Sequence, residues 1–165
     1  MDVDALFREH RPRLLRYVFR LAGDLDVAED VIQETFVRAM ERAPADDSNV
    51  RAWLFVIATN LVRDRGKQGE RRREIDRQRH SEPKGDRAPA TPLEELERRE
   101  LRGRLLAALD GLGERERIAV VMREEGFVHR EIAEALGTTT GTIGTLLARA
   151  FNKLARELEL DGPAR

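Results

Sequence analysis

The sequence predicts an all-α protein of two small helical domains joined by a flexible linker, and three observations carry that prediction. Leu, Ala, Arg and Glu are abundant, whereas the chain has one Trp, one Tyr and six Phe, a composition that favours helices over β-sandwiches and barrels. Apolar residues recur at helical spacing along most of the 165 residues. That periodicity disappears between residues 66 and 92, which are charged and rich in Gly and Pro, so two domains of roughly 70–80 residues flank this stretch.

The first domain, residues 1–80, is expected to open with two amphipathic helices. The first is predicted to end at Gly23, and the second to begin at Asp26, which forms a capping box with Glu29. The first helix should bury Leu6, Phe7, Leu14, Val18 and Leu21. The second should bury Val27, Val31, Ile32, Phe36 and Met40.

A third helix is predicted from Val50 to about Arg65, after a loop over residues 43–49. Its expected core residues are Trp53, Leu54, Val56, Ile57 and Leu61. Residues 66–80 either extend this helix or form a short fourth one. Residues 81–92 are the candidate flexible linker.

The second domain, residues 93–165, is expected to begin with a leucine-rich helix that Gly111 and Gly113 break. Its inward side should be formed by Leu93, Leu96, Leu101, Leu105 and Leu109. A further helix is predicted over residues 114–125, with Ile118, Val121 and Met122 in the core and Gly126 at its end.

The segment from His129 to Leu146 fits the template of a helix-turn-helix motif. Ala133 falls where two crossing helices leave no room for a larger side chain, and Gly137 falls where the turn needs positive φ. The apolar template positions are Ile132, Leu136, Ile143 and Leu146, and Thr139 or Thr140 is expected to cap the second helix. The alternative is an αα-hairpin within a helical bundle that binds no DNA.

In a DNA-binding motif of this kind, the start of the second helix reads base edges in the major groove. The residues placed there are Thr140, Thr142, Gly144 and Thr145, with Arg149 further along and positioned for a phosphate. No Lys or Arg lies between Arg130 and Arg149. Because cations normally neutralise phosphates and pair with guanine, weak intrinsic DNA affinity is expected.

The predicted second helix of the first domain carries a polar side formed by Asp30, Gln33, Glu34 and Arg38. Alone, such a face is ordinarily a solvated surface. Here it precedes a tryptophan-containing helix, a basic tail and a helix-turn-helix motif, and this combination favours a binding role. Trp53 is either a surface for base stacking or a core residue, and its spacing with Leu54 and Ile57 favours the core.

Charge and composition limit the possible functions. The net charge is −1, but residues 63–79 carry eight basic and four acidic side chains, so contact with nucleic acid should be local.

The absence of Cys excludes disulfides and thiolate chemistry, and no apolar run approaches a membrane span. We expect a soluble, cytoplasmic protein without a cofactor. An enzyme is not expected, because the sequence contains no metalloprotease motif, phosphate-binding glycine loop or nucleophile elbow.

From about Ala5 to Leu158, the chain resembles the extracytoplasmic-function (ECF) group of bacterial RNA polymerase sigma factors. The residues that carry the resemblance include Asp30 with Gln33-Glu34-Thr35-Phe36, Trp53-Leu54 with Ile57-Ala58 and Asn60, Leu109 with Leu112, and Glu131 to Gly137 with Gly141-Thr142-Ile143. The resemblance implies a promoter-specificity subunit. Its first domain would dock Asp30, Gln33, Glu34 and Arg38 on the clamp helices of the core polymerase.

The same resemblance places recognition of the −10 element on the loop that contains Asn49 and Arg51 and on the following helix. Asn60 matches the position that reads an unstacked base, and Arg63 and Arg65 would hold the DNA backbone. The second domain would bind the polymerase flap and read the −35 element.

In that second domain, Gly144 and Leu146 stand where the family usually has cations. A diverged −35 target, or reliance on another regulator at the promoter, would each explain the difference. An anti-sigma factor is a further expected partner. The alternative function is a sigma-like regulator, or a protein that titrates a partner, which does not itself support initiation.

Overall fold

The structure is a computed structural model, described here for residues 2–42, 44, 49–66 and 89–158. All regular secondary structure in these residues is helical, which confirms the predicted fold class. The chain divides into two compact units, Met1–Pro83 and Lys84–Arg165. Most of the expected linker and of the possible extension of the third helix lies outside the described residues.

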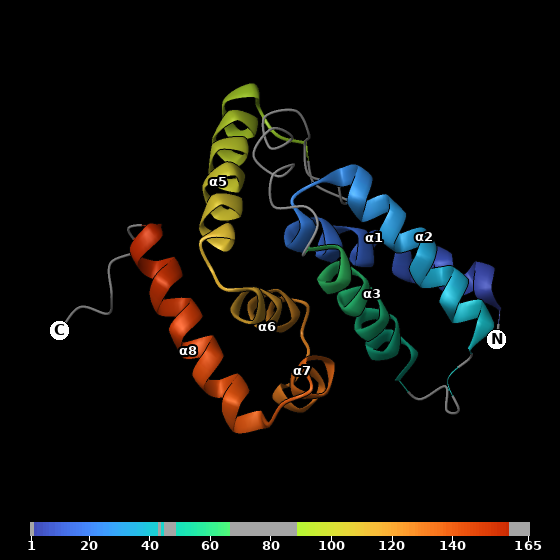
Figure 1. The fold of residues 1–165 in the computed structure, drawn as a ribbon. Helices are drawn as coiled ribbons and strands as arrows, with labels where there is room; N and C mark the ends of the chain where they lie inside the picture. The colour runs from blue at the N-terminus through green and yellow to red at the C-terminus, as the bar shows by residue number, and fades with distance from the viewer. Residues whose placement is uncertain (1, 43, 45–48, 67–88, 159–165) are drawn as a thin grey trace. The chain divides into compact units, whose positions relative to one another are not determined.

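The first unit packs three helices against one another: α1 (Val3–Ala22), α2 (Leu25–Glu41) and α3 (Val50–Gly66), drawn from blue to green in Figure 1. Asp2 caps α1 by accepting hydrogen bonds from the N–H groups of Asp4 and Ala5. Gly23 ends it in the left-handed region at φ 72°, as predicted.

The predicted start of α2 is wrong by two residues. Asp24, not Asp26, is the N-cap, and its carboxylate accepts hydrogen bonds from the N–H groups of Asp26 and Val27. Glu29 forms no capping box. Its carboxylate instead accepts two hydrogen bonds, of 2.9 and 2.8 Å, from Nη2 of Arg11 on α1. Glu29 therefore links α1 to α2.

The core of the first unit differs in part from the predicted one. Phe55 and Ala58 are buried on α3, whereas Trp53, Val56 and Ile57 are only half-buried. On α2, Met40 is 59% exposed. Because α3 is apolar on nearly every side, its periodicity does not indicate which side faces α1 and α2.

A buried polar contact lies at the centre of this unit. The hydroxyl groups of Tyr17 and Thr59 are 2.6 Å apart, and Thr59 donates its proton to the carbonyl of Phe55 at 2.6 Å. Since Thr59 has only that proton to give, Tyr17 is the donor in the bond between them. The Tyr17 and Phe55 rings also pack with their centroids 4.8 Å apart.

The second unit consists of α5 (Pro92–Asp110), α6 (Glu114–Glu124), α7 (His129–Leu136) and α8 (Thr140–Glu157). In Figure 1 these run from yellow-green to red. Thr91 and Glu94 form a capping box at the start of α5. Ile118, Val121 and Met122 of α6 are buried, as predicted.

The inward leucine face predicted for α5 is wrong. Leu109 is buried, but Leu93, Leu96 and Leu101 are 65%, 52% and 60% exposed, and Leu105 is 37% exposed. In the part of the unit that the structure describes, the core is formed by α6, α7 and α8, and the buried residues of α5 are Ala108 and Leu109 near its C-terminal end. The spacing correctly predicted a helix but could not show whether a partner covers its apolar residues.

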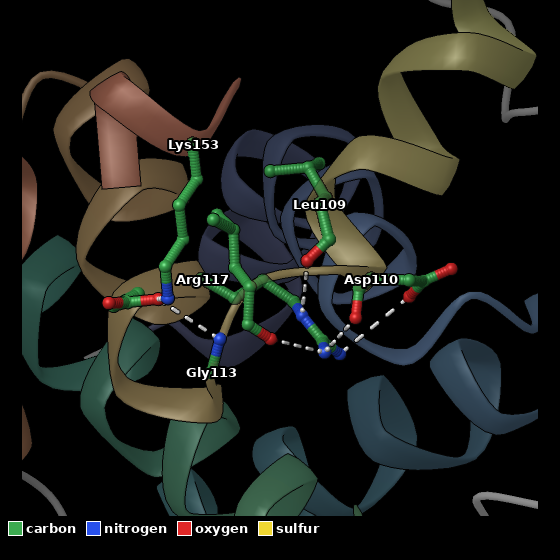
Figure 2. Close-up of polar contacts among 7 residues, drawn as sticks. Leu109, Asp110, Gly113, Arg117 and Lys153 are labelled. Carbon is green, nitrogen blue, oxygen red and sulfur yellow. Dashed lines mark hydrogen bonds and ion pairs between the residues drawn. The ribbon is translucent and has the colours of Figure 1, made fainter. Parts of the chain in front are cut away.

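Arg117 of α6 holds the end of α5 (Figure 2). Its Nε donates to the carbonyl of Leu109 at 3.0 Å, and its Nη2 donates to the carbonyls of Asp110 and Leu112 at 3.4 and 3.3 Å. Its Nη1 lies 3.8 Å from the carboxylate of Asp110. One guanidinium therefore contacts three carbonyl groups at the end of α5 and in the turn that follows it, where the regular intrahelical donors run out.

Candidate nucleic-acid and protein interfaces

The polar side predicted on α2 is accessible. The side chains of Asp30, Glu34 and Arg38 are 69%, 40% and 47% exposed, and Gln33 is exposed as well. Arg38 Nε donates to the carboxylate of Glu34 at 2.9 Å, one helical turn away. These residues therefore present mixed charge on the outer side of the helix.

Two exposed apolar side chains, Val37 and Met40, lie on the same side of α2 as these polar residues. The sequence did not predict them as part of this surface. Val37 is 43% exposed and Met40 is 59% exposed. They follow Gln33 and Glu34 at helical spacing, which places them on one face with the polar residues. Accessible apolar side chains next to charged and polar ones are common in protein–protein interfaces. In the sequence, the spacing of Gln33, Val37 and Met40 by four and three residues already places these two apolar side chains on the polar side of the helix.

The predicted −10 residues are distributed along α3. Asn49 precedes the helix, and its side-chain oxygen accepts a hydrogen bond from the N–H of Ala52 at 3.3 Å. The guanidinium of Arg51 lies 5.6 Å from the ring centroid of Phe55. These two residues thus have structural contacts at the start of α3.

Towards its other end, α3 carries Asn60, which is exposed, and Arg63 and Arg65, which are half-buried. Arg65 Nη1 lies 3.8 Å from the carboxylate of Asp30 on α2. The structure therefore brings together one residue expected to hold DNA and one expected to bind polymerase. Trp53 is half-buried, between the two roles considered for it. Residues 67–79 of the basic segment lie outside the described residues.

The helix-turn-helix geometry of α7 and α8 is confirmed. Ala133 is 5% exposed between the helices, and Gly137 has φ 63°. Thr139, rather than Thr140, caps α8 by accepting a hydrogen bond from the N–H of Thr142. One core position is wrong: Leu147 is buried, whereas Leu146 is half-buried.

Several side chains expected to read the −35 element have local contacts. The hydroxyl of Thr142 is 3.0 Å from that of Thr139, and Thr145 donates to the carbonyl of Gly141 at 3.3 Å. Thr140 and Arg149 are exposed. Gly144 has open space around its position, because a Cβ there would meet no heavy atom within 4 Å.

Lys153 is a further cation of α8, which the sequence did not predict as part of a site. Its Nζ donates to the carboxylate of Glu116 on α6 at 2.7 Å, and the N–H of Gly113 donates to the same oxygen at 3.1 Å (Figure 2). Lys153 holds the pKa of Glu116 below its ordinary value through this hydrogen bond, and the Gly113 N–H and the charge of Arg149 act in the same direction. The two residues are 37 positions apart, so no local pattern predicts the pair.

Across the residues that the structure describes, no three His, Asp or Glu side chains come together in a way that could hold a metal ion. No helix among them is both long and apolar enough to cross a membrane.

Comparisons with known proteins agree with this arrangement. The family model for sigma-70 region 2 matches residues 6–73, and that for sigma-70 region 4 matches residues 102–154. The chain is 34% identical over 154 residues to the ECF RNA polymerase sigma factor EcfG of Rhodopseudomonas palustris, an alignment that covers 92% of this chain and 82% of that protein. The chain belongs to the ECF RNA polymerase sigma factors.

Other ECF sigma factors differ from this chain in length. It is 34% identical over 157 residues to the probable ECF sigma factor SigI of Mycobacterium tuberculosis, but it spans only 54% of that protein, about half its length. A solved structure of the sigma factor RpoE from Bartonella quintana, in complex with the anti-sigma factor NepR, is similar in fold. It has a TM-score of 0.72 at 24% identity and covers 98% of this chain and 99% of its own.

Proposed function

We propose that this ECF sigma factor is the promoter-specificity subunit that directs core RNA polymerase to a dedicated set of promoters and assists initiation. The observation that carries the proposal is the order of two separate helical units in one chain, a region 2 unit followed by a region 4 helix-turn-helix. Such a protein acts in the cytoplasm by binding and performs no catalysis of its own.

The outer face of α2 is the proposed docking surface for the clamp helices of the polymerase. Asp30, Gln33, Glu34 and Arg38 supply polar and charged groups, and Val37 and Met40 supply exposed apolar area beside them, towards the C-terminal end of the helix. Accessible apolar side chains beside charged ones fit a partner that binds reversibly, because the exposed apolar area stays small in the free protein.

The proposed −10 surface lies on α3. Asn60 is exposed and available to an unstacked base, and Arg63, one turn further along, and Arg65, five residues after Asn60, are proposed to hold the DNA backbone. Asn49 and Arg51 complete the set at the start of the helix. Accessible polar groups beside cations are what single-stranded DNA requires of a binding surface.

The proposed −35 surface is the N-terminal part of α8, which carries Thr140, Thr142, Gly144 and Thr145, with Arg149 for a phosphate. The flap of the polymerase is the proposed protein partner of the second unit. An anti-sigma factor is proposed as a regulator, by analogy with the RpoE structure, which is in complex with one.

One observation favours a second function. The recognition helix has a single cation among its proposed contacts, so duplex affinity should be low. A sigma-like regulator that binds polymerase, or that titrates a partner without supporting initiation, would tolerate such a helix.

The test combines the full chain with bacterial core polymerase and a library of promoter fragments, followed by sequencing of the 5′ ends of the transcripts. We expect transcripts that begin downstream of a shared sequence. A matched control carries Asp30→Lys and Glu34→Lys, which should abolish core binding while circular dichroism stays unchanged. Core binding without transcripts would support the regulator that binds polymerase, and no core binding by the natural chain would refute the proposed function and leave only the titration of another partner.

A further inference from the structure

One acidic side chain in the second unit faces the cations of the recognition helix. Glu116 lies in the first turn of α6, and its side chain is only 10% exposed. It accepts hydrogen bonds from Lys153 Nζ and from the N–H of Gly113. The charge of Arg149, one turn before Lys153 on α8, also stabilises the Glu116 carboxylate. The carboxylate is therefore oriented towards α8.

Lys153 extends the proposed DNA-contacting face of α8. Thr142, Thr145, Arg149 and Lys153 are separated by three, four and four residues. Such intervals place side chains on one side of a helix. This stripe covers about 16 Å along the axis, at roughly 1.5 Å per residue. A phosphate backbone that meets Arg149 would thus pass close to the position of Lys153.

We infer that Glu116 restrains the sequence-independent affinity of this unit for duplex DNA by holding Lys153 away from phosphates. The inference rests on the function proposed above and names a specificity-determining residue for it. Non-specific binding arises almost entirely from cations that neutralise phosphates. A lysine already paired with a carboxylate must lose that partner first, so low backbone affinity leaves promoter choice to the base contacts and to polymerase.

The charge of Glu116 is not required for the local fold. A glutamine at this position retains an oxygen that can accept the hydrogen bond of the Gly113 N–H. The turn between α5 and α6 is held independently by Arg117. The substitution Glu116→Gln therefore removes the charge that holds Lys153 and leaves the helix start with its acceptor.

The experiment measures binding of the full chain to a mixed-sequence duplex of about 20 base pairs, by fluorescence anisotropy, over a series of salt concentrations. Glu116→Gln should tighten binding about three- to eightfold near 0.1 M salt and steepen the salt slope by about 0.9, the value for one added phosphate contact. Adding Lys153→Gln to that variant should return both quantities to those of the natural chain.

The matched control is Glu124→Gln, which removes the same charge from the exposed last turn of α6. It should change affinity less than twofold. Equal tightening by both variants would show that only the net charge matters and would overturn the inference. A folded Glu116→Gln variant whose affinity is unchanged or weaker would overturn it as well.

A second measurement uses the natural chain and does not depend on how any variant folds. The sequence has three lysines, Lys67, Lys84 and Lys153, so acetylation of each is easily resolved by mass spectrometry. DNA should leave the reactivity of Lys153 unchanged, whereas strong protection by DNA would refute the restraint. Both assays omit polymerase, so their failure is distinguishable from a failure to support transcription.

Discussion

The carboxylate of Asp30 on α2 lies 3.8 Å from the guanidinium of Arg65 near the end of α3. In the proposed function, Asp30 faces polymerase and Arg65 faces the DNA backbone, so one ion pair connects two binding surfaces. Docking of polymerase on Asp30 would release Arg65 for DNA. Because Asp30 is exposed and Arg65 is only half-buried, solvent screens the pair and the coupling should be small, at about 0–1 kcal/mol.

The first prediction follows from this pair. Asp30→Asn should weaken binding to core polymerase and, at the same time, tighten binding of the full chain to single-stranded DNA by up to about fivefold. Polymerase pull-down and anisotropy with an oligonucleotide measure the two effects. Asp26→Asn, also exposed on α2, is the control and should change neither. Parallel losses in both assays would show that the pair does not couple the surfaces.

The second prediction separates reading of a base from holding of the backbone on α3. Asn60→Ala should relax the preference at one promoter position, with a loss of about 1–3 kcal/mol for the preferred base. Arg63→Ala should weaken binding to every sequence and flatten the salt dependence. Affinities for a panel of −10 oligonucleotides at two salt concentrations test this. Equal, sequence-independent losses from both variants would make Asn60 a structural residue.

The third prediction concerns the two sides of α8. Gly144→Arg adds a cation where there is open space, so duplex affinity should rise and the salt slope should steepen by about 0.9. The substitution should also favour the helix by about 0.8–1 kcal/mol. Leu147→Arg should instead lower the thermal midpoint sharply, because Leu147 is 6% exposed and an unpaired buried charge is unfavourable. No gain in affinity from Gly144→Arg would mean that α8 does not contact DNA.

The fourth prediction concerns the buried hydroxyl pair of the first unit. Tyr17→Phe removes the donor to Thr59 while retaining the ring that packs on Phe55. The free energy of unfolding should fall by about 1 kcal/mol, the usual net value of a hydrogen bond. Chemical denaturation measures it. A loss well above that amount would indicate that the ring packing had changed too.

The fifth prediction concerns acid stability. Lys153, Arg149 and the Gly113 N–H lower the pKa of Glu116 in the folded state from its ordinary value of 4.5. Between the two values the unfolded state binds more protons, so stability rises with pH in that window. The stability advantage of the natural chain over Glu116→Gln should therefore be complete above pH 4.5 and disappear as the pH falls through the folded-state value. Denaturant curves from pH 7 to pH 3 give the comparison, and a pH-independent difference would contradict it.

The sequence predicted best where a local steric demand fixes the residue type. Ala133 and Gly137 meet such demands, a close helix crossing and a positive φ, and the helix-turn-helix was found from them. Helices were predicted well because periodicity is a local property. Their starts were less certain, since Asp24 and Asp26 are both suitable caps and only the fold selects Asp24.

Properties that depend on partners could not be predicted in the same way. The leucines of α5 have the spacing of a buried face, yet most are exposed because, among the residues that the structure describes, the packing of the unit covers only the C-terminal end of this helix. The sequence did not predict that Phe55 is buried, because most of its neighbours on α3 are equally apolar. The pairing of Arg65 with Asp30, and of Lys153 with Glu116, joins residues on different helices, and no sequence pattern links such positions.

The hydrogen bonds of Arg117 with the carbonyls of Leu109, Asp110 and Leu112 bear on how this part of the chain folds. Arg117 is only eight residues after Leu109, so the guanidinium and the carbonyls that it contacts belong to one short segment of the chain. The Leu109 carbonyl also accepts a hydrogen bond from the N–H of Leu112, so the backbone itself closes the end of α5 and the guanidinium adds further donors from α6. The junction between α5 and α6 therefore forms from contacts between residues close together in the sequence, and such local contacts require little loop closure and can form early in folding.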